Sequence, residues 1–171
     1  MSNDRSFIEQ NARERDRFRS LVSRLTDAEL ASSVNEHWTV AGVLGHLAFW
    51  DGRALFLSGK LVEGMQFTPS DDEPDDPDWI NDASRPLIHA VPPRQLADLV
   101  VRGAEETDAA VAALSPELAA RTYPADPTSP LNAVRAHHRA EHLDEIEVAL
   151  ERISSACSNS MLNATQRCST A

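Results

Sequence analysis

The chain has few of the residues that cross-link or interrupt a fold. Its 171 residues include only two cysteines, Cys157 and Cys168, both within the last fifteen positions. Cysteines placed there cannot staple a core, so the sequence does not predict a disulfide scaffold. Glycine is also sparse, with six residues, and apolar residues in the long segments recur about every 3.6 positions rather than every second one. These features favour an all-helical chain.

Basic residues are scarce as well, with 16 Lys and Arg against 27 Asp and Glu, a formal net charge of −11 and a pI near 4.9. A surface that binds nucleic acid needs clustered Lys and Arg, so we expect no nucleic-acid partner. The chain also has no run of 18 apolar residues, and no basic segment followed by an apolar one. We therefore expect no membrane partner and a soluble, cytoplasmic protein.

Four long segments have the apolar periodicity of amphipathic or buried helices: residues 3–25, 39–59, 94–114 and 131–153. Thr39 is the expected N-cap of the second segment, and Thr26 with Glu29 forms a capping-box pattern before a short extra helix. Further short pieces are expected near 79–90 and after Ser115. We predict an all-α four-helix bundle over residues 1–154, with short helices in the connections and a weakly ordered polar tail at 155–171.

An acidic segment separates the second and third long helices. Residues 66–78 hold six acidic residues, three prolines and no basic residue, so we expect a loop without packed structure of its own. A loop of this length makes an up-down-down-up order of the four helices possible. The segment could be a solvated connection or a lid over a site, and the sequence leaves both open.

Histidines mark the core-facing side of two of the helices. His138 and His142 are four residues apart, so a helix places them one turn apart, on the same arc as the apolar residues Val134 and Ile146. His46 lies in the middle of the second helix, which is apolar on most of its circumference. Three such imidazoles could bind a divalent metal ion and leave a coordination position open. They could equally be core histidines hydrogen-bonded within the bundle. His37, His89 and His137 are expected on the surface.

Two motifs give the chain a family resemblance. The segment WTVAGVLGHLAFWDGR (38–53) resembles the second-helix signature of the DinB-like superfamily, which includes mycothiol-dependent maleylpyruvate isomerases and bacillithiol transferases. The segment HHRAEHLDEIE (137–147) is similar to the fourth-helix motif of that family. The resemblance implies a divalent metal, zinc or nickel foremost, held by His46, His138 and His142. A homodimer is also consistent with it. The isomerase branch commonly carries Glu where His138 stands, so that particular reaction is not implied.

Three further residues are candidates around the histidines. Arg53 lies two helical turns beyond His46 and on its side, so it could bind a carboxylate of the substrate, or it could be a surface arginine. Asp51 or, better, Glu145 could orient a histidine ligand through the other ring nitrogen. No cysteine lies within the predicted bundle, so a nucleophilic thiol would have to come from a low-molecular-weight thiol cofactor.

The sequence therefore predicts a metal-dependent, thiol-linked transferase or isomerase that acts on a small electrophilic substrate. Two alternatives stay open. One is a non-enzymatic bundle that binds small molecules, as a resistance protein does, with histidines that only line its pocket. The other is a homodimeric structural protein with a vestigial site.

Overall fold

The computed structural model describes residues 5–67 and 77–168, with side chains described as far as Ala156. This part of the chain forms α-helices and no strand, which confirms the expected all-α class. The seven helices described are α1 (Phe7–Arg24), α2 (Asp27–Ala31), α3 (Val40–Val62), α4 (Pro77–His89), α5 (Pro93–Ala112), α6 (Pro116–Ala119) and α7 (Ala136–Cys168).

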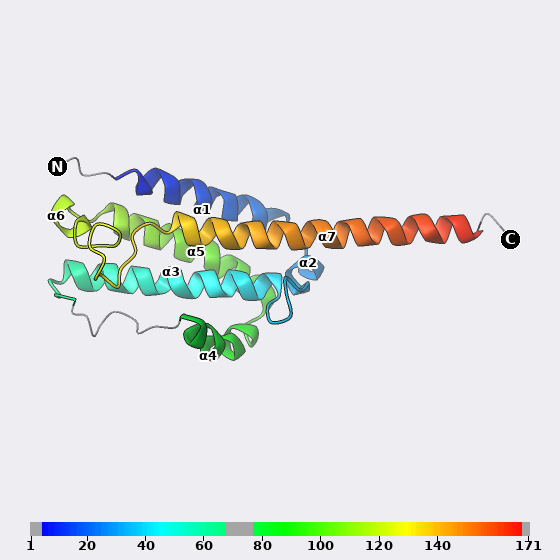
Figure 1. The fold of residues 1–171 in the computed structure, drawn as a ribbon, viewed down its shortest axis with the longest axis horizontal. Helices are drawn as coiled ribbons and strands as arrows, with labels where there is room; N and C mark the ends of the chain where they lie inside the picture. Colours follow the sequence, from blue (N-terminus) through cyan, green and yellow to red (C-terminus); the bar gives the residue numbers. More distant parts are fainter. Residues whose placement is uncertain (1–4, 68–76, 169–171) are drawn as a thin grey trace.

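The four long helices α1, α3, α5 and α7 run side by side, and α7 extends beyond the others at its C-terminal end (Figure 1). Their directions follow the up-down-down-up order, because the chain crosses back along the bundle between α3 and α5. Short helix α4 lies on this crossover and packs against α3, whereas α3 and α5 make the most extensive contact. Residues 68–76, most of the acidic segment, lie outside the described residues.

No helix in the described ranges combines the length and the apolar character needed to cross a membrane.

Side-chain caps start the helices where the sequence predicts them. Thr26 and Glu29 form the complete capping box of α2, with each side chain accepting from the other residue's backbone N–H at 3.2 Å and 2.8 Å. Thr39 accepts from the backbone N–H of Gly42 at 3.0 Å and starts α3. Each cap satisfies a backbone donor that the first helical turn leaves without a partner.

Helix α3 ends later than the predicted Ser58–Gly59 boundary, because neither residue breaks the helix. It runs to Val62, and Gly64, with a φ of 91°, turns the chain out of the helix. A residue in this left-handed conformation after the last turn is a common helix end, and glycine adopts it without steric cost.

Helix α7 begins at Ala136, so the prediction that Leu131 starts it is wrong by five residues. Asn11 of α1 explains the difference. Its side-chain carbonyl accepts from the Ala136 backbone N–H and its amide donates to the Ala133 carbonyl, both at 2.9 Å. At its other end α7 continues to Cys168, through the segment for which the sequence predicts weak order; the weak order itself stays a prediction.

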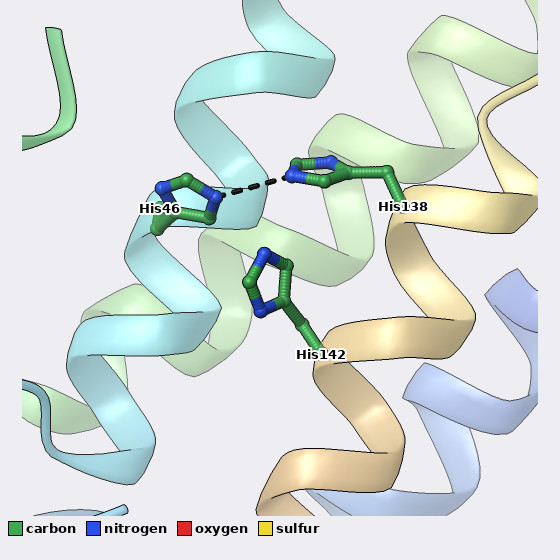
Figure 2. Close-up of side chains that lie close together, drawn as sticks. All are labelled: His46, His138 and His142. Carbon is green, nitrogen blue, oxygen red and sulfur yellow. Dashed lines mark hydrogen bonds between the residues drawn. The ribbon is translucent and has the colours of Figure 1, made fainter. Parts of the chain in front are cut away.

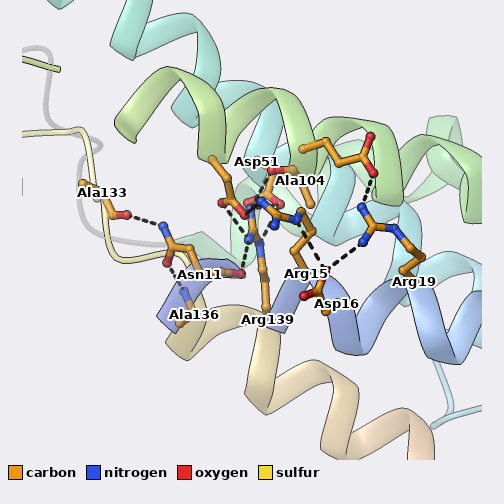
Figure 3. A network of polar contacts seen from close by, with 11 residues as sticks. Asn11, Arg15, Asp16, Arg19, Asp51, Ala104, Ala133, Ala136 and Arg139 are labelled. Carbon is orange, nitrogen blue, oxygen red and sulfur yellow. Dashed lines mark hydrogen bonds and ion pairs between the residues drawn. The ribbon is translucent and has the colours of Figure 1, made fainter. Parts of the chain in front are cut away.

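A buried network of charges joins α1, α3, α5 and α7 beside the apolar core (Figure 3). Asp51 of α3 has no exposed surface and pairs with Arg135 and Arg139, each at 2.9 Å. Arg139, also fully buried, pairs at 2.9 Å with Asp108 of α5, which Arg15 of α1 contacts at 3.1 Å. Burial raises the pKa of Asp108, against the effect of its arginine partners. The network fixes the beginning of α7 against α3, where the histidines lie.

Candidate metal centre

His46 lies one and a half turns into α3, on the face of the helix that is turned toward the core. Its side chain is 6% exposed and its ring lies between the indoles of Trp38 and Trp50, at centroid distances of 5.8 Å and 6.3 Å. The preceding Gly45 allows α3 to pack closely here, since a Cβ at that position would lie 2.6 Å from Ile88 and 2.9 Å from Leu96. Helix packing therefore fixes His46 in depth and orientation.

His138 and His142 face His46 from consecutive turns of α7 (Figure 2). The Nε2 atoms of His46 and His138 are 3.1 Å apart. The ring centroid of His142 lies 4.8 Å from that of His46 and 4.9 Å from that of His138. One ring nitrogen from each residue can be chosen so that all three lie within 4.8 Å of one another. The structure thus brings together the three histidines singled out in the sequence.

The donor set fits a divalent metal ion. Neutral imidazole is the form that coordinates metals. Burial, together with repulsion from the His142 ring when it is protonated and from Arg135, lowers the pKa of His46 to about 4. Burial and the Arg135 charge lower the pKa of His138 to about 2. Both rings are therefore neutral at pH 7, and together with His142 they offer three ring nitrogens from two helices that could hold one ion with an open coordination position.

Glu145 is placed to orient His142, as the sequence suggested. Its Oε2 atom lies 2.8 Å from Nδ1 of His142, one turn earlier on α7. A carboxylate at Nδ1 keeps the ring proton on that nitrogen and leaves Nε2 free to coordinate. Asp51, the weaker candidate for this role, does not contact a histidine directly; it binds Arg135 instead.

Arg135 is a residue at this site that sequence reasoning missed. Its Nη2 lies 3.2 Å from Nδ1 of His138, and its Nε donates to Asp51 at 2.9 Å. Guanidinium only donates, so Nδ1 accepts and the neutral ring carries its proton on Nε2, facing His46. Coordination through Nε2 requires that proton to move to Nδ1 and Arg135 to withdraw from it. In the sequence, only the position of Arg135 three residues before His138 could have indicated this contact.

A cavity of about 460 Å³ opens above the histidines. Its floor and sides combine imidazoles, two indoles and Val43, and three exposed carboxylates lie at its edge. Its lining residues are Asn35, Trp38, Val43, His46, Trp50, Pro77, Asp78, Asn81, His138, Glu141, His142 and Glu145. Asn81 of α4 accepts a hydrogen bond from the Trp50 indole at 3.0 Å, which fixes one wall.

Arg53 does not line this cavity. It donates to the Pro130 carbonyl at 2.9 Å, and its guanidinium lies 5.8 Å from the centroid of Trp50. The structure therefore gives it a role between α3 and the loop before α7. His37, His89 and His137 are all exposed and lie outside the histidine cluster.

Comparison with models of protein families gives a match over most of the chain. The family model described as the DinB superfamily matches residues 10–146 of this chain. No curated protein and no solved structure matches it significantly. The matched range contains the whole histidine cluster and most of the four-helix bundle.

Proposed function

The chain belongs to the DinB superfamily, and from this premise and the histidine geometry we propose that it is a metal-dependent enzyme. The proposed reaction is the thiol-linked transfer or isomerisation of a small electrophilic substrate. The observation that carries the proposal is the convergence of His46, His138 and His142 at the floor of a cavity large enough for a small molecule.

When bound, a divalent cation would supply Lewis acidity that lowers the pKa of a coordinated thiol or water toward neutrality. The three neutral imidazoles would leave the full positive charge of the ion in place. Glu145 holds the ring proton of His142 on Nδ1, and the indoles of Trp38 and Trp50 give the cavity an apolar wall beside His46. Residues 1–156 contain no cysteine, so the thiol has to be a small molecule.

Metal analysis of untagged protein by plasma mass spectrometry tests the first half of the proposal. After incubation with zinc or nickel and desalting, we expect about one ion per chain in the wild type and none in His142→Ala. His137→Ala is the matched control, because it removes the exposed neighbouring histidine. A wild type without metal, or a His142→Ala protein that retains it, would overturn the assignment.

The reaction type needs its own measurement. The metal-loaded protein should accelerate the conjugation of a small thiol to an electrophile, and both the chelated protein and the His142→Ala variant should lose that acceleration. A loaded protein with no effect on any thiol tested would leave a metal site without the thiol-linked activity.

The alternative is a small-molecule binding bundle without a functional metal. The contact between Arg135 and His138 favours it, because together with the His46–His138 hydrogen bond it satisfies both nitrogens of the His138 ring without an ion. In that case the wild type would take up no metal, and the tryptophan fluorescence of Trp38 and Trp50 would report ligand binding.

A homodimer, which the sequence suggested, remains part of the proposal. Large apolar side chains on the outer face of α3 support it, since Phe49 is 41% and Phe56 63% exposed. Static light scattering should then give twice the chain mass, and a monomer mass at all concentrations would contradict it.

A further inference from the structure

The edge of the cavity carries one sign of charge. Asp78 of α4 and Glu141 and Glu145 of α7 line it, and no Lys or Arg is among the lining residues. The amide side chains of Asn35 and Asn81 complete the polar part of the lining. An anionic group of a ligand at this edge would therefore find no Lys or Arg in the lining to pair with.

Two acidic residues of α7 that lie outside the cavity form ion pairs with arginines of α1. Asp144 pairs with Arg17 at 2.5 Å, and Glu147 pairs with Arg17 and Arg24 at 2.7 Å and 3.2 Å. Glu141 has no ion-pair partner among the described residues. It also lies four residues before Glu145, and like charges at this spacing repel each other on one face of a helix.

Three arginines close to the cavity are not part of its lining. Arg135 lies behind His138 and pairs with Asp51, and Arg53 donates to a backbone carbonyl. Arg85 pairs with Asp82 and lies 5.3 Å from the centroid of Trp38. Trp38 lines the cavity, but Arg85 does not. No Lys or Arg of the lining therefore pairs with Glu141.

We propose that the cavity selects a ligand that carries a cationic amino group beside its metal-binding atom, with the amino group held by Glu141 at the edge of the cavity. This inference rests on the proposed metal function, which supplies the anchor for the other end of the ligand. A cation at the floor attracts an anionic donor atom such as a thiolate, whereas the edge attracts an ammonium group. The chemical class that satisfies both is a small aminothiol.

Three hydroxamates of one length test the charge preference without assuming a thiol. They are butyrohydroxamate, β-alanine hydroxamate and succinate monohydroxamate, which end in a methyl, an ammonium and a carboxylate group. Each is titrated by calorimetry into the cobalt-loaded protein. We expect the ammonium compound to bind about tenfold tighter than the neutral one, the range of a charge-assisted hydrogen bond, and the carboxylate compound to bind most weakly.

Glu141→Gln should reduce the preference for ammonium over methyl severalfold, because it removes the carboxylate that has no other partner. The ratio between the two compounds cancels any difference that the variant makes to the metal itself. Glu151→Gln is the matched control, since it removes an exposed glutamate of α7 that does not line the cavity. Its ratio should equal that of the wild type. The preference should also shrink as salt is raised.

The outcomes separate the two proposals. A protein that takes up no cobalt overturns the metal function and removes the anchor, so the ligand inference falls with it. A loaded protein that binds no hydroxamate, binds all three equally or binds the carboxylate compound tightest overturns the ligand inference alone. An unchanged ratio in Glu141→Gln also overturns it, whereas the expected ratios support an amine-bearing ligand.

Discussion

The lowered pKa values of His46 and His138 make the stability of the metal-free protein depend on pH. Both folded values lie below the ordinary 6.5, at about 4 and about 2. The unfolded chain therefore takes up protons that the folded chain excludes, so the stabilisation is present above pH 6.5 and is lost as the pH falls. We expect the free energy of unfolding to fall by about 2 kcal/mol per histidine between pH 7 and pH 5.

Urea unfolding of the chelated protein at pH 7, 6 and 5 measures this dependence. The double variant His46→Gln with His138→Gln should show a much smaller loss over the same range, because it removes both groups. His137→Gln should behave as the wild type, since His137 is exposed. Equal losses in the wild type and the double variant would show that the two histidines do not carry the effect.

For single residues, the sequence predicted the convergence of the three histidines well and the contacts around them poorly, and the metal they are expected to bind stays a prediction. The spacing of His138 and His142, and the place of His46 in an apolar helix, predicted which side chains converge. The contact of Glu145 with His142 followed from the same periodicity. Arg135 could not be predicted, because its position depends on where α7 begins, and that boundary was predicted five residues too early. Arg53 was left open between a substrate-binding and a surface arginine, and the structure shows it donating to the Pro130 carbonyl.

Between elements, the carboxylate of Asp51 joins α3 to α7 inside the bundle. It is fully buried between the guanidinium groups of Arg135 and Arg139. Asp51→Ala would leave both cations buried with fewer partners, and breaking a buried pair from one side costs about 3–5 kcal/mol. We expect a loss of that size in the free energy of unfolding, measured by urea denaturation.

The exposed pair between Arg19 of α1 and Glu105 of α5 provides the comparison. Glu105→Ala should cost less than about 1 kcal/mol, because solvent screens the pair. If Asp51→Ala costs no more than Glu105→Ala, the buried network does not hold α3 against α7.

Helix boundaries were predictable where the signal was local. The caps at Thr26, Thr39 and Ser115 lie within a few residues of the backbone groups that they satisfy. The start of α7 depends on Asn11, which is 125 residues from Ala136 in the chain. A sequence pattern cannot show such a contact, so the periodicity of apolar residues extended the predicted helix too far.

For the whole molecule, the histidine cluster joins the two halves of the chain. His46 and His138 are 92 residues apart in sequence and lie on different helices of the bundle. The binding site exists only in the folded protein, so an ion bound there should stabilise the bundle as one unit. At a free metal concentration of a hundred times Kd the gain is about 2.7 kcal/mol, and for a chain of this length we expect a rise in Tm of about 5–10 °C.

Differential scanning calorimetry with zinc, and then with an excess of chelator, measures this rise and its reversal. His137→Ala should retain the shift, and His142→Ala should lose most of it because one of the three nitrogen donors is gone. A shift of equal size in His142→Ala would mean that zinc binds elsewhere on this acidic chain. Exposed carboxylates bind such ions weakly, so a shift that persists near one equivalent of zinc and disappears only in the histidine variants would locate the ion between α3 and α7.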